Sequence, residues 1–188
     1  SSTVIDDVFE TVESATERLA KVLSQLRKKQ VEQNSNNQEN IASIIEKVVR
    51  QSNIRQPQVE FLCSDQSELL IDGESFMSVM HHLIQNAQEA TKNDGWVKVT
   101  LVETKRTIDI GIEDNGCGMT EEFINNRLFR PFDTTKGNAG MGIGVYEAKQ
   151  FFESISGVIA VESEPDVGTK FSISISKPAI VDEPTQAS

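Results

Sequence analysis

The segment from His81 to Ala90 places two histidines and an asparagine on a predicted helix. His82 and Asn86 are four residues apart and share one helical face. An asparagine oxygen is a suitable ligand for Mg²⁺, whose remaining positions phosphate oxygens can fill. Taken alone, the segment also fits a plain helix on which Asn86 binds nothing.

A second segment, Asp114-Asn115-Gly116-Cys117-Gly118-Met119, directly follows a predicted strand. A carboxylate at the end of a strand can accept a hydrogen bond from an adenine amino group. Gly116 and Gly118 would let the backbone come close to such a ligand. A turn with two glycines explains the same residues structurally, so this motif is weak by itself.

A run of glycines, Gly137-Asn138-Ala139-Gly140-Met141-Gly142-Ile143-Gly144, leads into another predicted helix. Free N–H groups and the positive dipole end at a helix N-terminus suit a phosphate group. The alternative is a flexible hinge. Helix stabilisation does not explain glycines at every second position, because each interior glycine costs about 1 kcal/mol relative to alanine.

Two phenylalanines, Phe129 and Phe132, lie in a polar loop between these glycine segments. They could anchor a flap against the core, and Arg130 and Lys136 of the same loop could reach phosphate oxygens. The turn at 165–171 leads into the last predicted strand, and an ordinary hairpin turn explains it almost completely.

The elements that must position these residues follow from hydrophobic periodicity. Antiparallel strands with helices on one face indicate an α+β fold, a two-layer α/β sandwich with a mixed, mainly antiparallel sheet. The order is not the βαβ alternation of a P-loop or Rossmann domain, and the sequence has no G-x-x-x-x-G-K-[ST] motif. We predict helices at 39–51, 73–92 (with Asp72 as N-cap), 120–126 and 142–154, strands at 59–63, 68–71, 96–102, 107–113, 158–162 and 169–176, and an irregular loop at 127–141.

One long helix is predicted ahead of this sandwich, at residues 3–30. Its apolar residues form a heptad seam, which favours one helix of a bundle between subunits over a helix folded onto its own domain. The seam consists of Ile5, Val8, Val12, Ala15, Leu19, Val22 and Leu26. We therefore predict a bundle helix and linker at 1–35 (the polar stretch 31–38 being the linker), a domain at 36–177 that contains the candidate site residues, and a disordered tail at 178–188.

The composition restricts the class of protein. A formal net charge of -11 argues against a nucleic-acid surface, which requires a basic stripe. Two cysteines are too few for a disulfide framework and favour a reducing compartment. We expect no membrane segment and no signal peptide in this chain. We also expect a cytoplasmic domain, in line with the reducing compartment. We also expect Ser1 to be an artificial start, so the parent protein could still be anchored in the inner membrane.

In order and spacing, these segments resemble the ATP-binding domain shared by histidine kinases, DNA gyrase, Hsp90 and MutL, the Bergerat fold. The asparagine box, first glycine box, phenylalanine box, second glycine box and final Gly-Thr all follow in family order over about 39–176. The tetrapeptide Val145-Tyr146-Glu147-Ala148 is similar to the sensor kinases of exosortase/PEP-CTERM systems.

The resemblance implies a protein-histidine kinase of a two-component system that uses ATP and Mg²⁺. It places Mg²⁺ on Asn86, the adenine amino group on Asp114, and a lid over ATP at about 126–141. The residues implied in nucleotide binding are Asn86, Asp114, Gly116, Gly118, Lys136, Gly140, Met141, Gly142, Ile143, Gly144 and Thr169; those implied in catalysis are Asn86, His82 and Lys136.

Two positions depart from the family pattern. His82 stands where many kinases have a second asparagine and where gyrase-type ATPases have a glutamate that activates water. Glu89 stands where many kinases have a lysine, so one basic phosphate contact is missing or comes from the lid.

The resemblance also implies partners. The helix at 3–30 matches the second helix of a dimerisation domain, whereas the family's phosphoacceptor histidine lies on the first. The only histidines here are His81 and His82. We therefore expect a phosphoacceptor helix elsewhere in a homodimeric parent and a response regulator receiver domain downstream. The alternatives are a Bergerat ATPase acting as a clamp or chaperone, and a nucleotide-binding pseudokinase acting as a dimeric scaffold.

Overall fold

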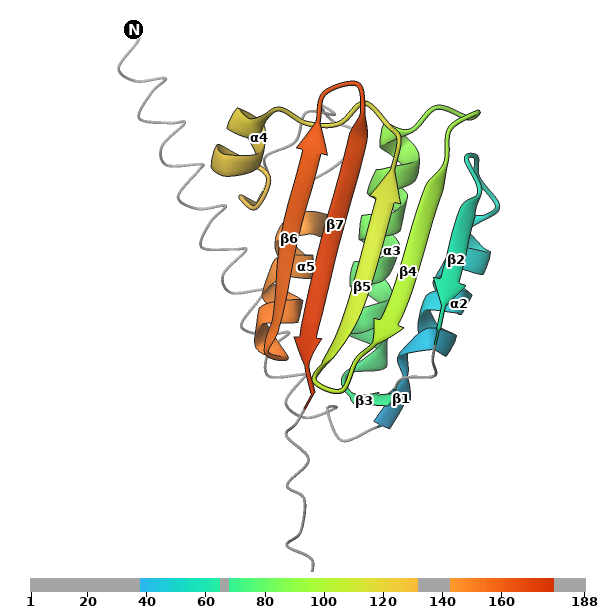
Figure 1. Cartoon of the computed structure of the whole chain (residues 1–188), viewed down its shortest axis with the longest axis vertical. Coiled ribbons are helices and arrows are strands. Elements are labelled where there is room, and N and C mark those ends of the chain that lie inside the picture. Colours follow the sequence, from blue (N-terminus) through green and yellow to red (C-terminus); the bar gives the residue numbers. More distant parts are fainter. Residues whose placement is uncertain (1–37, 65–67, 132–142, 178–188) are drawn as a thin grey trace, which may run out of the picture.

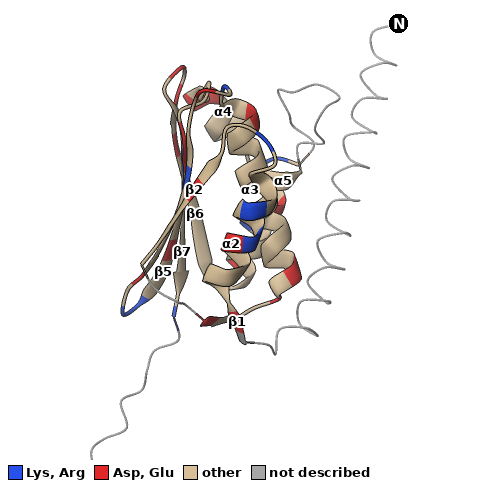
Figure 2. Ribbon diagram, turned by 90° about the vertical axis from the view of Figure 1, so that its right-hand side faces the viewer, with Lys and Arg blue, Asp and Glu red and all other residues tan. Residues whose placement is uncertain are grey.

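The computed structural model describes residues 38–64, 68–131 and 143–177, which form two layers (Figures 1 and 2). Three helices cover one face of a five-stranded sheet, which confirms the predicted α/β sandwich. The strands are β1 (Gln38–Asn40), β2 (Val59–Cys63), β3 (Glu68–Leu70), β4 (Val97–Glu103), β5 (Thr107–Asp114), β6 (Gly157–Glu164) and β7 (Gly168–Ser176); the helices are α2 (Ile41–Ser52), α3 (Gly73–Ala90), α4 (Glu121–Asn126) and α5 (Gly144–Ser154). Helices α2, α3 and α5 form the covering layer.

The main sheet has the strand order β2-β4-β5-β7-β6. Strand β2 runs parallel to β4, and every other neighbouring pair in this sheet is antiparallel. The sheet is therefore mixed and mainly antiparallel, as predicted. The parallel pair is possible because the long connection between its strands contains α3.

The core lies between the sheet and the helices. In β5, Ile108, Ile110 and Ile112 are buried, whereas Asp109 and Gly111 between them are only partly buried, on the outer face. This alternation is the period of two that a half-buried strand requires. Phe76 of α3 and Phe152 of α5 are fully buried and meet edge to face, with ring centroids 6.3 Å apart.

Capping side chains determine where the helices begin. Asp72 caps α3 as predicted, because its Oδ1 accepts from the backbone N–H of Glu74 at 3.1 Å. Helix α2 begins at Ile41, two residues later than predicted. Asn40 caps it, and Gln38–Asn40 pairs with β3 as the short strand β1. The prediction therefore missed this strand, because Gln38 was assigned to the linker and residues 39–40 to the helix.

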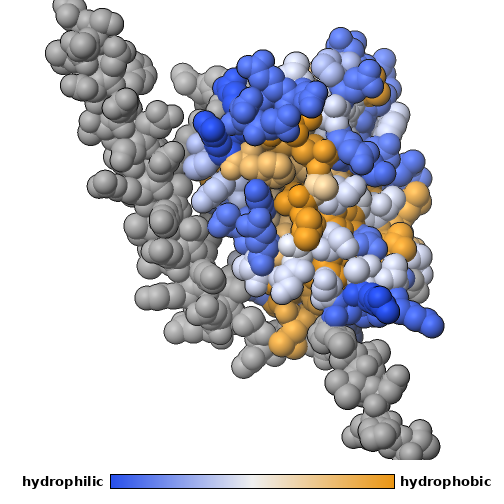
Figure 3. Space-filling view, turned by 60° about the vertical axis from the view of Figure 1, so that its left-hand side comes forward, coloured by the Kyte–Doolittle hydropathy of each residue, from blue (hydrophilic) through white to orange (hydrophobic). Residues whose placement is uncertain are grey.

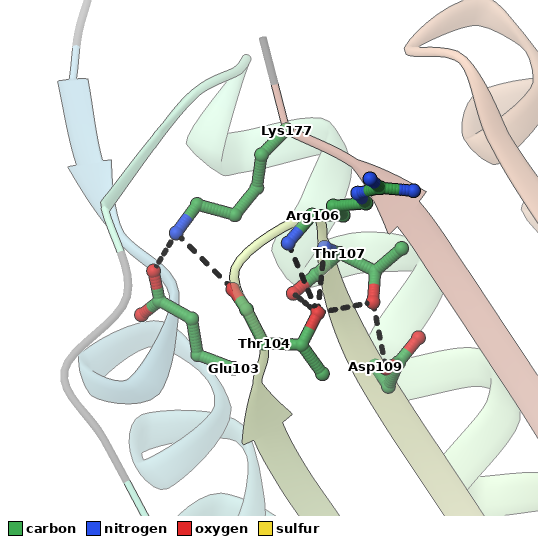
Figure 4. A network of polar contacts seen from close by, with 6 residues as sticks. All are labelled: Glu103, Thr104, Arg106, Thr107, Asp109 and Lys177. Atoms are coloured by element: carbon green, nitrogen blue, oxygen red, sulfur yellow. Dashed lines mark hydrogen bonds and ion pairs between the residues drawn. The ribbon is translucent and has the colours of Figure 1, made fainter. Parts of the chain in front are cut away.

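A polar network closes the β4–β5 hairpin (Figure 4). The Thr104 hydroxyl oxygen accepts from the backbone N–H of Thr107 at 2.9 Å, and the Thr107 hydroxyl donates to Asp109 at 2.9 Å. Lys177, just after β7, forms an ion pair with Glu103 at the end of β4. The ion pair therefore links the C-terminal end of β7 to the β4–β5 hairpin.

The surface carries some apolar side chains. Figure 3 faces the β6 edge of the sheet, where apolar residues gather between hydrophilic ones, and Val158 of β6 is 66% exposed. Exposed apolar residues are normal on soluble proteins, so this area assigns no function by itself. None of the helices among the described residues combines the length and apolar character that a bilayer span requires. The heptad seam at 3–30 and the tail from Pro178 lie outside the described residues.

Candidate functional site

Asp114 is the last residue of β5, and its carboxylate is almost enclosed. It is 5% exposed, and its Oδ1 accepts from the backbone N–H of Gly116 at 2.8 Å. Burial raises the pKa of Asp114; hydrogen bonds from the Gly116 and Thr169 backbones and from the Thr91 hydroxyl oppose that rise, and the charge of Glu113 adds to it. The site thus holds a buried acceptor at a strand end.

Backbone segments approach one another closely around this carboxylate. Gly118 has a φ of +63°, and a Cβ there would lie 1.9 Å from the carbonyl oxygen of Glu164. Gly168 has a φ of +142°, and a Cβ there would lie 2.0 Å from the carbonyl oxygen of Asp114. Both positions therefore require glycine, for conformation as well as for space.

The loop after Asp114 is joined to the end of α3. The Cys117 N–H donates to the carbonyl oxygen of Ala90 at 3.0 Å, and a Cβ on Gly116 would lie 2.5 Å from that same oxygen. Asn115 of the loop is also bonded to the residue just before β4, since its Oδ1 accepts from the Trp96 N–H at 2.7 Å. The loop and the C-terminus of α3 therefore form one unit.

Thr169 lies opposite Asp114 in the β5–β7 register and is 7% exposed. Its hydroxyl is 2.9 Å from that of Ser163 on β6. The Ser163 hydroxyl donates to the carbonyl oxygen of Gly168 at 2.8 Å and accepts from the Met119 N–H at 2.8 Å. The predicted Gly-Thr element is thus joined to the first glycine box through Ser163.

Sequence reasoning missed two residues of this site, Ser163 and Thr91. Thr91, the C-cap of α3, is 8% exposed, and its hydroxyl donates to the carbonyl oxygen of Ala87 at 2.8 Å. The same side chain also interacts with the Asp114 carboxylate and lowers its pKa. The position of Thr91 directly after the asparagine box was the available indication; Ser163 had none, because its role depends on strand register.

Asn86 and His82 lie on α3 and are both partly buried, one turn apart. The imidazole of His82 lies beside the start of α5, and a Cβ on Gly144 would be 3.1 Å from the His82 Cβ. The structure therefore brings His82 next to the last glycine of the second glycine box. Glu89, the other departure from the family pattern, is exposed and accepts from Gln85 Nε2 at 2.7 Å.

The phenylalanine box is described only in part. Leu128 belongs to the core and is 7% exposed. Phe129 is partly buried and packs against the core. The Lys149 ammonium of α5 lies 4.8 Å from the centroid of the Phe129 ring, which is cation–π range. Arg130 is exposed. Outside the described residues lie Phe132, Lys136, Gly140, Met141 and Gly142, together with most of the predicted lid.

Helix α5 begins at Gly144, two residues later than predicted. Its N-cap is Ile143, which provides no side-chain hydrogen bond to the first turn. The described residues therefore leave the N-terminal N–H groups of α5 without a side-chain cap, at the point where the predicted phosphate-binding glycines end.

The chain is similar to proteins of known family. Residues 71–179, which are 109 of the 188 residues, match the family described as histidine kinase-, DNA gyrase B- and HSP90-like ATPase. The chain is 35% identical over 106 residues to sporulation kinase A of Bacillus subtilis, covering 56% of this chain and 17% of that protein. It is 33% identical over 113 residues to the sensor histidine kinase YvrG of Bacillus subtilis, covering 58% and 20%. The chain thus spans about one fifth of these two relatives.

Solved structures agree on the fold. The catalytic domain of histidine kinase ThkA superposes with a TM-score of 0.64 at 25% identity, covering 75% of this chain and 97% of that domain. The mycobacterial sensor histidine kinase MprB gives a TM-score of 0.66 at 19% identity, covering 75% of this chain and 97% of that chain, and this likeness concerns the fold alone.

Proposed function

This chain belongs to the histidine kinase-, DNA gyrase B- and HSP90-like ATPase family, and we propose that it is the ATP-binding catalytic domain of a sensor protein-histidine kinase. The proposed reaction transfers the γ-phosphoryl group of ATP to a histidine imidazole nitrogen. Both histidines of this sequence lie on α3, so we place the acceptor on another helix of the parent. The proposal rests above all on Asp114, a buried carboxylate enclosed by glycine backbone at a strand end.

We assign the adenine amino group to Asp114, with Gly116, Gly118 and Thr169 shaping the pocket around it. An ionised carboxylate that accepts a hydrogen bond from this amino group is a charge-assisted contact, worth about 1.5–3 kcal/mol. Guanine carries a carbonyl oxygen at the corresponding position, which would face the carboxylate as a second acceptor. Asp114 would therefore select adenine nucleotides.

We assign the phosphate groups to the start of α5 and the glycines before it. Gly144 and Ile143 are described there, and Gly140, Met141, Gly142 and Lys136 belong to the same assignment. The uncapped N–H groups of α5 suit an anionic ligand. Phosphoryl transfer depends mainly on positioning and charge stabilisation, which such groups provide.

We assign Mg²⁺ to Asn86. Among the described residues, no group of three or more His, Cys, Asp or Glu side chains could hold a metal ion. That fits Mg²⁺, which is commonly held by one or two protein oxygens and completed by phosphates and water. When bound, the ion would offset the negative charge of the phosphates, and Asn86 would orient it through its amide oxygen.

Calorimetry with ADP tests these assignments. Asp114→Asn should weaken ADP binding about 10- to 100-fold, because the amide can present a donor to the adenine amino group. Asp109→Asn is the matched control, since Asp109 lies on the same strand and its carboxylate bonds to Ser174 on the outer face. Asn86→Ala should reduce the Mg²⁺ dependence of ATP binding. Unchanged ADP affinity in Asp114→Asn would rule out the adenine assignment.

We also propose the partners and the cellular location of the parent protein. A response regulator receiver domain would receive the phosphoryl group, and the predicted helix at 3–30 would pair in a homodimeric parent. The domain would work in the cytoplasm, with the parent anchored in the inner membrane. Placement with the exosortase/PEP-CTERM sensor kinases remains a prediction that rests on Val145-Tyr146-Glu147-Ala148 alone.

A further inference from the structure

His82 presents two different ring edges to its surroundings. Its Nδ1 is buried and makes no hydrogen bond with any described residue. In contrast, 39% of the side chain remains exposed. Because Nδ1 is enclosed, the exposure lies on the ring edge that carries Nε2. One ring nitrogen therefore faces the protein and the other faces the open side of α3.

The group that faces the buried nitrogen is a carboxylate. Glu147 Oε2, in the first turn of α5, lies 3.7 Å from His82 Nδ1, and 24% of the Glu147 side chain is exposed. A closer approach by roughly 0.7 Å would bring the two atoms to hydrogen-bond distance.

The start of α5 packs directly against the imidazole of His82. A Cβ on Gly144 would lie 3.1 Å from the Cβ and 3.4 Å from the Cγ of His82. The imidazole thus rests against the backbone of the residue three positions before Glu147. This packing places the Nδ1 edge of the ring beside the first turn of α5, which carries the carboxylate.

We propose that Glu147 is a positioning residue that holds His82 in the tautomer protonated at Nδ1, so that Nε2 becomes a hydrogen-bond acceptor on the same helical face as Asn86. A lone pair on Nδ1 would be repelled by the carboxylate oxygen, whereas an N–H group is attracted to it. The partner of one imidazole nitrogen decides which nitrogen carries the proton.

The consequence for the site rests on the proposed function. Nε2 of His82 would accept a hydrogen bond from a water molecule or ligand donor near Asn86, one helical turn away. Glu147 itself would touch neither nucleotide nor metal. It acts through His82.

The nitrogen-15 chemical shifts of the imidazole test the tautomer in the chain without nucleotide. We expect His82 to be protonated at Nδ1 at about pH 8.5, where an ordinary imidazole is neutral. His81→Gln leaves His82 as the only histidine and assigns its signals. Glu147→Gln should retain this tautomer, because the amide oxygen can still accept, whereas Glu147→Met should shift His82 to the Nε2-protonated form that solvated histidine prefers.

Glu153→Met is the matched control. It removes a carboxylate from the same helix, one that pairs with Lys149 at 3.9 Å, and should leave the His82 signals unchanged. His82 protonated at Nε2 in the wild type, or an unchanged tautomer in Glu147→Met, would overturn the proposal.

Calorimetry with Mg·ADP tests the role of the acceptor separately. Glu147→Met and His82→Leu should each weaken binding about three- to tenfold, and the double variant should be no weaker than His82→Leu. Unchanged Mg·ADP affinity in a Glu147→Met protein whose tautomer has shifted would overturn that role. A wild-type chain that fails to bind Mg·ADP would instead contradict the proposed function, while the tautomer measurement would still decide the assignment of Glu147.

Discussion

Replacing Gly118 by alanine tests the close backbone packing around the proposed adenine pocket. Its φ of +63° costs a residue other than glycine about 1–2 kcal/mol. A Cβ would also lie 1.9 Å from the Glu164 carbonyl oxygen and 2.7 Å from its carbon, so backbone must move. Overpacking of this kind costs about 1–3 kcal/mol. Together, these terms predict that Gly118→Ala lowers the free energy of unfolding by about 2–5 kcal/mol.

Gly111→Ala provides the matched control. A Cβ there would lie 2.6 Å from the Thr100 hydroxyl oxygen, on the outer face of the sheet, where the side chain can rotate away. The alanine also restricts the unfolded chain, so we expect a change within about 1 kcal/mol of zero. Urea unfolding followed by circular dichroism gives both values, provided that the slope m is unchanged. Equal losses in the two variants, or a smaller loss in Gly118→Ala, would refute the packing argument.

Three further changes test other parts of the structure. Burial raises the pKa of Asp114 above 3.8, so the folded chain holds this proton more tightly than the unfolded chain. The stability that the bound proton contributes is present below pH 3.8 and is lost as the pH rises through the raised pKa. Urea unfolding should therefore show Asp114→Asn gaining stability relative to wild type as the pH rises above 3.8. Ser163→Ala removes the hydroxyl that joins Met119, Gly168 and Thr169, and should cost about 1–3 kcal/mol in the same assay and weaken ADP binding in calorimetry. Lys177→Met breaks the ion pair with Glu103 and should cost about 1 kcal/mol while leaving ADP affinity unchanged, because the hairpin network contains no residue of the proposed site; a weakened ADP affinity in this variant would contradict that separation.

Local patterns predicted most of the described elements. The strand predicted at 107–113 and the capping carboxylate of Asp72 depend only on neighbouring residues, and the structure confirms both. Strand β2 was predicted with the bounds that the structure gives it. The short strand β1 was missed because three polar residues carry no alternation, and only pairing with β3 stabilises them.

The site was predicted to a smaller extent than the fold. Asp114 and Gly118 could be named from their motif, because an acceptor and a glycine turn at a strand end leave a recognisable pattern. Ser163 contributes through the register of β6 and β7, which brings it opposite Thr169. Glu147 approaches His82 only after α3 and α5 have packed together. Contacts of this kind arise from tertiary structure and leave no local trace in the sequence.

Phosphoryl transfer from radiolabelled ATP to a histidine tests the central claim most directly. The phosphoacceptor helix of the parent protein, supplied in trans to this chain, should gain acid-labile phosphate, and Asn86→Ala should abolish that product. The chain alone should bind ATP, hydrolyse it slowly and gain no acid-labile phosphate. Rapid ATP turnover by the chain alone, lost in His82→Ala and without any phosphohistidine on the added helix, would contradict the kinase and favour a clamp-type ATPase.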